Sequence, residues 1–141
     1  MYQYIQLEFS GSVGRLTLDR PEKRNALKRT FIEEIRQGLA ELTSNPELRV
    51  LVLAANGSVF CAGMDLGEMQ ERAGSADGAA EWHRDSEIYC DLLVDLYSLD
   101  IPVIAAVSGP ALAGGMGMIL ACDIVVASDN AFFMLPEPAR G

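Results

Sequence analysis

Several kinds of residue are scarce in this chain, and each scarcity excludes a class of site. Only one histidine, His83, and three cysteines occur among the 141 residues. The cysteines, at positions 61, 90 and 122, match no metal-ligand spacing, and no serine lies in the strand-to-helix turn of a serine hydrolase. We therefore expect neither a metal site nor a Ser-His-Asp triad, and we expect His83 to lie on the surface.

Basic residues and long apolar runs are scarce as well. The chain has 11 lysines and arginines against 20 aspartates and glutamates, which gives a formal net charge of −9. Nucleic-acid binding requires a basic surface, so this balance argues against it. No apolar run reaches the roughly 18 residues of a membrane span. We expect a protein that binds neither nucleic acid nor membrane.

The cysteines and the N-terminus bear on location. An odd number of cysteines, two of them in apolar or small-residue segments, is typical of reduced thiols in the cytosol or in an organelle matrix. Met1 leads directly into a strand pattern, without the features of a signal or transit peptide. We therefore expect a cytoplasmic protein.

The pattern of apolar residues predicts an α/β protein with one core, because half of the residues are apolar. Alternating or continuous apolar runs predict strands at residues 5–9, 13–18, 50–55, 103–107, 124–127 and 131–135. The run at 124–127 is typical of a buried strand. Helical spacing predicts long helices at 31–42 and 88–99, and the polar segment at 67–80, rich in glycine and alanine, predicts a mobile loop.

Residues 103–121 organise the chain. A strand typical of burial on both faces leads through a turn of small residues at 108–115 into an apolar segment typical of a buried helix. Such a turn directs free backbone N–H groups, and the positive end of the helix dipole, at one place. That place suits an anion, or an oxygen that becomes one.

A second turn of this kind follows the strand at 50–55. It reads Cys-Ala-Gly-Met-Asp-Leu at 61–66, with Asp65 at the expected cap of a helix. One such turn is also found at phosphate sites and in plain tight turns. Two turns in one chain can direct two N–H donors at a single oxygen, which is the geometry of an oxyanion hole.

Four motifs resemble the crotonase superfamily, which comprises the enoyl-CoA hydratases and isomerases. They lie at residues 20–27, 60–66, 102–115 with 122–123, and 136–137, in the family's order and with similar spacing. The resemblance implies the spiral fold of stacked ββα units shared by ClpP and crotonase. It covers residues 1–141 as one crotonase-like core that is incomplete at the C-terminus and is without the C-terminal helical part. It also implies a homotrimer or hexamer at full length, and we expect this chain alone, if it is a fragment, to fold poorly.

The resemblance further implies an acyl-CoA enzyme that stabilises the enolate of a thioester. Met64 and Gly114 would donate the two backbone hydrogen bonds, and Glu137 would be the acid and base. Apolar neighbours at 132–135 predict a pocket around Glu137, and Pro138 favours an extended backbone there. Coenzyme A would be part of the substrate, with no permanently bound cofactor. The residues expected to contact it are Lys23, Arg24, Ala26, Leu27, Ala62, Asp65, Leu66 and Gly115, with Arg20 completing a basic cluster.

Gly117 departs from the family pattern. Hydratases with two glutamates carry the first one here, and Glu68, Asp85 and Glu87 are the candidates to replace it. One carboxylate is sufficient to move a proton between carbons, as in double-bond isomerisation, but some hydratase-like members also lack this glutamate. Hydration and isomerisation therefore both stay open. Decarboxylation or thioester hydrolysis on the same scaffold, and a non-catalytic acyl-CoA-binding relative, are the alternatives.

Overall fold

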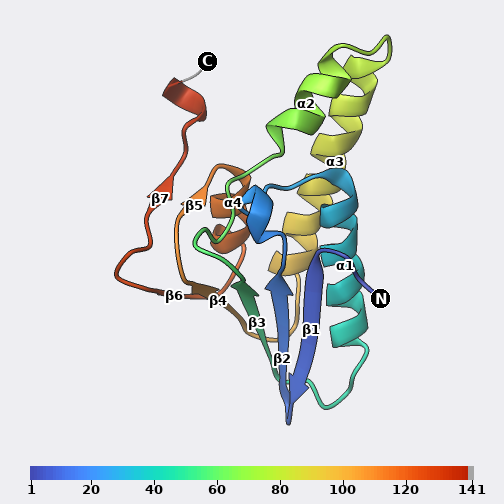
Figure 1. Ribbon diagram of the computed structural model, residues 1–141. Helices are drawn as coiled ribbons and strands as arrows, with labels where there is room; N and C mark the ends of the chain where they lie inside the picture. Colours follow the sequence, from blue (N-terminus) through green and yellow to red (C-terminus); the bar gives the residue numbers. More distant parts are fainter. Residues whose placement is uncertain (140–141) are drawn as a thin grey trace.

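A five-stranded sheet is the framework of the structure, a computed structural model that describes residues 1–139 (Figure 1). Its strands, in spatial order, are β1 (Ile5–Ser10), β2 (Val13–Leu18), β3 (Val50–Ala55), β4 (Val103–Val107) and β6 (Ile124–Ala127). β1 and β2 form an antiparallel hairpin, whereas β2, β3, β4 and β6 are parallel. Two short strands, β5 (Ala111–Leu112) and β7 (Phe133–Met134), pair separately and in parallel.

Helices connect the parallel strands, because a parallel pair requires a crossover. α1 (Arg29–Thr43) connects β2 to β3, α2 (Leu66–Ala73) and α3 (Gly78–Tyr97) connect β3 to β4, and α4 (Gly114–Leu120) connects β4 towards β6. Short 3-10 helices lie at η1 (Pro21–Lys23) and η2 (Glu137–Ala139). None of the helices within residues 1–139 combines the length and the apolarity that a membrane crossing requires.

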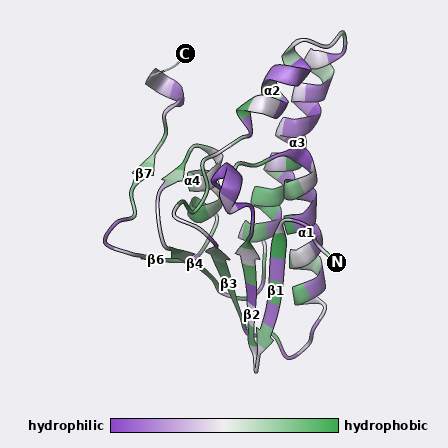
Figure 2. Cartoon of the chain, viewed as in Figure 1, coloured by the Kyte–Doolittle hydropathy of each residue, from purple (hydrophilic) through white to green (hydrophobic). Residues whose placement is uncertain are grey.

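The core lies between the sheet and the two long helices. α1 packs against β1, β2 and α3, and it buries the residues whose helical spacing the sequence showed: Phe31, Ile32, Ile35, Leu39 and Leu42. Figure 2 shows hydrophobic residues along β3 and β4, and hydrophilic residues over most of α2 and the adjoining part of α3. The α2–α3 hairpin therefore extends beyond the apolar core, as Figure 1 shows.

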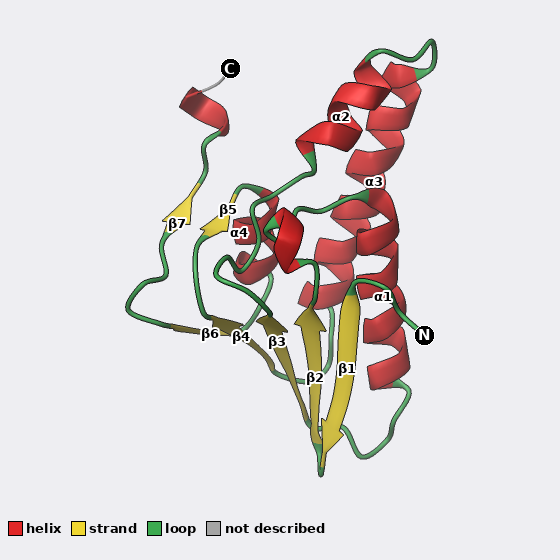
Figure 3. Cartoon of the chain, in the orientation of Figure 1, coloured by secondary structure: helices red, strands yellow, loops and turns green. Residues whose placement is uncertain are grey.

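Most predicted elements are confirmed, but four details are wrong (Figure 3). The predicted loop at 67–80 contains α2, and α3 begins ten residues before the predicted 88, at Gly78. The predicted strand at 131–135 shrinks to the two residues of β7. The strand at 124–127 forms, but it is not buried: its valines and isoleucine are 44–60% exposed, because within residues 1–139 it ends the sheet and packs extensively against β4 alone.

A matched pair of valines tests the position of the core. Val103 in β4 is 1% exposed and Val94 in α3 is 60% exposed. We expect Val103→Ala to lower the free energy of unfolding of the complete protein by about 2 kcal/mol, through lost burial and an unfilled cavity. Val94→Ala is the control and should change it by less than about 0.5 kcal/mol. Urea unfolding measures both, and equal losses would contradict this placement of the core.

Candidate active site

The turns after β3 and β4 lie against each other. The Leu112 N–H donates to the Cys61 carbonyl at 2.9 Å, and Cys61 and Ala111 form a parallel β-bridge. On the other side of the first turn, the Leu27 N–H donates to the Gly63 carbonyl at 2.7 Å and the Asp65 N–H donates to the Leu27 carbonyl at 2.8 Å. The loop before α1 and both turns therefore form one continuous backbone assembly.

Gly63 allows the two predicted donors to come together. Its φ is +92°, and a Cβ on this residue would lie 2.7 Å from the Ala113 Cβ and 3.4 Å from the Gly114 nitrogen. Ala113 itself has a φ of +49°, a conformation that costs energy for a residue with a side chain. The peptides that carry the Met64 and Gly114 nitrogens thus lie next to each other.

Neither of these two N–H groups is used within residues 1–139, because neither donates to a carbonyl or a side chain there. The bridge between Leu27 and Met64 uses the backbone groups on either side of Met64 and leaves its own N–H free. Gly114 is the first residue of α4, whose initial N–H groups have no acceptor inside the helix. Both residues are half-buried, so two free donors lie together in a partly shielded place.

Gly115 and Cys61 explain how closely α4 approaches the first turn. A Cβ on Gly115 would lie 2.5 Å from the Cys61 carbonyl oxygen and 2.6 Å from the Cys61 Cβ. Gly115 is buried in this contact, and its predicted contact with the substrate stays a prediction. Burial raises the pKa of the Cys61 thiol to about 12, and the thiol donates to the Asn25 carbonyl. Cys61 is therefore a packing residue and not a nucleophile.

Tyr89 is a residue of the site that no sequence pattern indicated. It projects from α3, and its hydroxyl donates to the Gly114 carbonyl at 2.7 Å. Burial raises the pKa of Tyr89 well above its ordinary value, and Cys61, Cys90 and Glu137 add to the effect. The phenol therefore stays protonated at neutral pH and keeps this hydrogen bond.

The pairing of β5 with β7 brings the segment that precedes Glu137 to the second turn. The Ala113 N–H donates to the Met134 carbonyl at 2.9 Å. Met134 therefore lies beside the residue that precedes Gly114, and Glu137 follows Met134 by three residues. Glu137 is exposed, and the residues at 132–135 are 43–51% exposed. The predicted apolar pocket is therefore wrong for the described residues. The predicted extended backbone is also wrong, because Glu137 begins η2, where Pro138 is tolerated in the first turn.

Asn25 fixes the loop at 20–27. Its buried side chain accepts from the Arg20 N–H at 2.8 Å and donates to the carbonyls of Asn56 and Val59, both at 2.9 Å. Arg24 and Asn25 both have a left-handed backbone, with φ values of 53° and 51°, which asparagine tolerates better than most residues. This loop therefore has one defined shape.

The predicted coenzyme A contacts in this loop divide into two groups. Lys23 and Arg24 are exposed, as contact with phosphates requires. Ala26 is half-buried, and Leu27 is fully buried in the core. Arg20 does not join the exposed basic cluster: it is 8% exposed and donates to the Ala26 carbonyl and to Asp65, each at 2.7 Å.

Asp65 begins α2, as the sequence predicted. Its carboxylate accepts from the N–H groups of Gly67 and Glu68, at 3.0 and 3.2 Å, in addition to Arg20. Burial alone would raise the pKa of Asp65, but the Arg20 guanidinium and the two N–H groups together hold it below its usual value. Ala62 is half-buried and Leu66 exposed, and the coenzyme A contacts of all three residues stay predictions.

The candidates for a second acid are engaged elsewhere. Asp85 pairs with Arg29 at 2.6 Å and with Arg72 at 2.7 Å, and Glu68 pairs with Arg72 at 3.0 Å. Both arginines also pair with Glu81, at 2.9 and 3.1 Å, so five side chains form one network that joins α1, α2 and α3. Glu87 faces His83 on the surface, which confirms the predicted exposure of the histidine.

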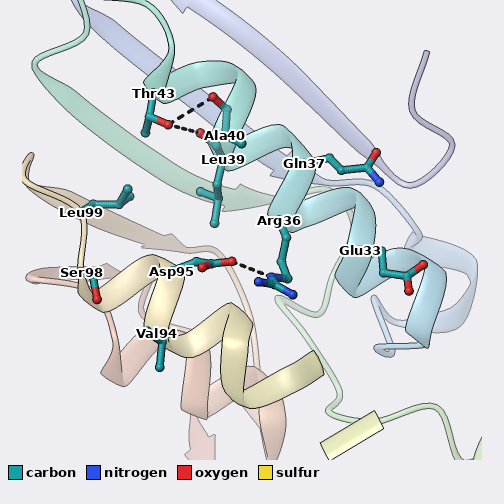
Figure 4. A pocket seen from close by; sticks show the side chains of 10 residues that line it. All are labelled: Glu33, Arg36, Gln37, Leu39, Ala40, Thr43, Val94, Asp95, Ser98 and Leu99. Atoms are coloured by element: carbon teal, nitrogen blue, oxygen red, sulfur yellow. Dashed lines mark hydrogen bonds and ion pairs between the residues drawn. The ribbon is translucent and has the colours of Figure 1, made fainter. Parts of the chain in front are cut away.

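A groove of about 620 Å³ lies away from these turns, between α1 and the end of α3 (Figure 4). The ion pair between Arg36 and Asp95, at 2.6 Å, crosses it. It shares no lining residue with the two turns or with the loop at 20–27. The candidate site therefore rests on the joined turns and not on this groove.

The fold and the joined turns define a class of protein: an α/β protein that holds two free backbone N–H groups next to each other. The chain belongs to the enoyl-CoA hydratase/isomerase family, whose model matches residues 8–141. It is 37% identical over 129 residues to the mitochondrial enoyl-CoA hydratase domain-containing protein 3 of Danio rerio, covering 92% of this chain and 43% of that protein. An enoyl-CoA isomerase/hydratase of Mycosarcoma maydis is 40% identical over 126 residues, covering 84% and 44%.

Solved structures agree with this assignment. The crystal structure of an enoyl-CoA hydratase from Shewanella pealeana superposes with a TM-score of 0.91 at 32% identity, covering 99% of this chain and 52% of that one. The fold is therefore the crotonase fold, as the sequence predicted. The chain spans about half the length of the relatives that it matches.

Two glycines test the contact between the turns. Gly63→Ala should lower the free energy of unfolding by about 3 kcal/mol, because it combines an unfavourable φ with overlap against Ala113. Gly74→Ala is the control: Gly74 has an ordinary φ of −85°, and its nearest neighbour to a new Cβ is 3.7 Å away. Urea unfolding of the complete protein compares them, and a harmless Gly63→Ala would contradict the close approach.

The ion pair of Asp65 makes a pH-dependent contribution to stability. Because folding lowers its pKa, the contribution is complete above the unfolded-state value of about 3.9 and is lost as the pH falls through the lower folded-state value. Wild type should therefore be more stable than Asp65→Asn at pH 7, and the difference should shrink towards pH 3. Asp77→Asn is the control, because Asp77 precedes α3 without a capping hydrogen bond. A difference that is constant with pH would contradict the ion pair.

Proposed function

We propose that the complete protein is an acyl-CoA-processing enzyme of the enoyl-CoA hydratase/isomerase type. The observation that carries the proposal is the pair of free N–H groups at Met64 and Gly114, held together by Gly63. In this proposal both donate to the thioester oxygen of a CoA substrate. The negative charge on that oxygen grows as the enolate forms, and each fixed donor is worth about 2.7–4 kcal/mol at that point. Coenzyme A enters and leaves as part of the substrate, and no permanently bound cofactor is needed.

Glu137 is the proposed acid and base. Its carboxylate removes a proton from the acyl carbon next to the thioester carbonyl or, in the reverse direction, from the carbon conjugated with that carbonyl through the double bond. The electron pair moves onto the thioester oxygen, which Met64 and Gly114 hold. The same proton then returns to another carbon of the acyl chain. The substrate keeps its mass, and its double bond changes position. The pairing of β5 with β7 supports this role, because it directs the chain that carries Glu137 past Ala113.

Double-bond isomerisation is the reaction that the described residues support best. It requires one carboxylate, whereas a two-carboxylate hydration requires a second group to activate water. Gly117 has no side chain, and Glu68 and Asp85 are held in ion pairs. Hydration stays within the proposal if residues outside 1–139 supply the second group.

The remaining predictions complete the proposal. Lys23 and Arg24 would contact the phosphates of coenzyme A, since both are exposed on a loop that Asn25 fixes next to the first turn. The complete protein would be a homotrimer or hexamer, which light scattering tests. A cytoplasmic location stays a prediction, and the relative from Danio rerio is named as mitochondrial.

One observation favours a second candidate, a non-catalytic acyl-CoA-binding protein. Glu137 is exposed, and its apolar neighbours form no pocket around it within residues 1–139. A protein that kept the two donors without a shielded carboxylate would bind acyl-CoA and leave it unchanged. Turnover distinguishes the two candidates.

Product masses, together with the ultraviolet absorption of the conjugated thioester, test the proposed reaction. Incubated with a 3-enoyl-CoA, the complete protein should form the conjugated 2-enoyl-CoA at unchanged mass, and Glu137→Gln should slow this by about 10²–10⁴-fold while substrate binding persists. Glu47→Gln is the control, because Glu47 is exposed between α1 and β3. A gain of one water on a 2-enoyl-CoA would establish hydration instead. Binding without turnover would establish the second candidate.

A further inference from the structure

Tyr89 occupies the space beside Gly117. A Cβ built on Gly117 would overlap the Tyr89 hydroxyl oxygen and would lie 3.3 Å from the Tyr89 Cζ and 3.9 Å from the Leu93 Cδ1. A Cβ on Gly114 would lie 3.4 Å from the Cε2 and Cζ of the same ring. The aromatic ring therefore covers the first turn of α4, and Gly117 is the residue that makes room for its hydroxyl.

The hydroxyl also holds the backbone of Gly114. Its hydrogen bond to the Gly114 carbonyl, at 2.7 Å, restrains the peptide that follows the free Gly114 N–H. The Ala113 N–H restrains the preceding residue through Met134, at 2.9 Å. The free N–H thus has a fixed peptide group on each side, one anchored by β7 and the other by α3.

We propose that Tyr89 is a positioning residue: it orients the Gly114 N–H through the Gly114 carbonyl, and with Gly117 it closes the space from which a second acid or base would reach the acyl chain. The inference rests on the proposed function and deepens it, because it gives a structural reason for a site with one carboxylate. The positioning effect needs the hydroxyl, whereas the packing of the ring against Gly114 does not.

Tyr89→Phe separates the two effects, since it removes the hydroxyl and keeps the ring. The probe is cinnamoyl-CoA, whose absorption band moves to longer wavelength when its carbonyl oxygen is polarised by hydrogen-bond donors. In the complete protein, we expect the variant to bind cinnamoyl-CoA with a smaller band shift and to lose about tenfold in kcat, with KM nearly unchanged. Tyr97→Phe is the control, because Tyr97 lies on the same helix and is 81% exposed.

The outcomes separate this inference from the function on which it rests. An active wild type whose band shift and kcat are unchanged in Tyr89→Phe would overturn the positioning role and leave the proposed function standing. A wild type that neither binds nor converts acyl-CoA would overturn both. A rise in KM alone, at constant kcat and band shift, would show that the hydroxyl contributes only uniform binding and would also overturn the positioning role.

A double-mutant cycle tests the shared space independently of activity. Gly117→Ala should destabilise the wild type, because its methyl group overlaps the Tyr89 hydroxyl, but it should be tolerated in the Tyr89→Phe background, where that oxygen is absent. Urea unfolding of the four proteins gives the coupling between the two sites. Additive effects would show that Tyr89 does not occupy the space beside Gly117 and would overturn the proposed closure.

Discussion

The direct contact between two backbone turns is the constraint on which the rest of this structure depends. Gly63 touches Ala113, and Gly115 touches Cys61, at distances that leave no room for a Cβ on either glycine. The hydrogen bond from Leu112 to Cys61 then joins the two turns, and the hydrogen bond from Leu27 to Gly63 joins the first turn to the loop before α1. The free donors at Met64 and Gly114 lie close together only because this contact is made entirely by main chain and small side chains.

The parallel sheet supplies the framework for that contact. Because β2, β3 and β4 run in the same direction, the segments that leave their carboxyl ends all emerge at one edge. These segments are the loop at 20–27, the turn at 61–65 and the turn at 111–115. The loop carries the exposed basic residues, the first turn carries the Met64 donor, and the second turn carries the Gly114 donor. The antiparallel β1 lies outside this arrangement and packs against α1 instead.

Local patterns predicted much of this arrangement. Continuous apolar runs located the parallel strands, and small-residue turns after two of them located both donors, because each signal is contained in a few neighbouring residues. Tyr89 carries no such signal: its role depends on where α3 packs against α4, a tertiary relation between residues far apart in the chain. Asn25 carried a weak sequence signal, since asparagine is among the few residues that favour a left-handed backbone. The sequence predicted that a helix begins after Asp65 but not that it continues to Ala73, because capping and ion pairs outweigh the loop-like composition there.

One network of ion pairs joins α1, α2 and α3. Its members are Arg29, Arg72, Glu68, Glu81 and Asp85. α2 has no fully buried residue, and ion pairs through Arg72 and Glu81 join it to α1 and α3. Dissolved ions screen exposed charges most and partly buried pairs less, whereas apolar burial does not depend on charge screening. The attachment of α2 therefore responds to ionic strength more than the packing of α1 on the sheet does, because charged pairs contribute to the first and apolar burial dominates the second.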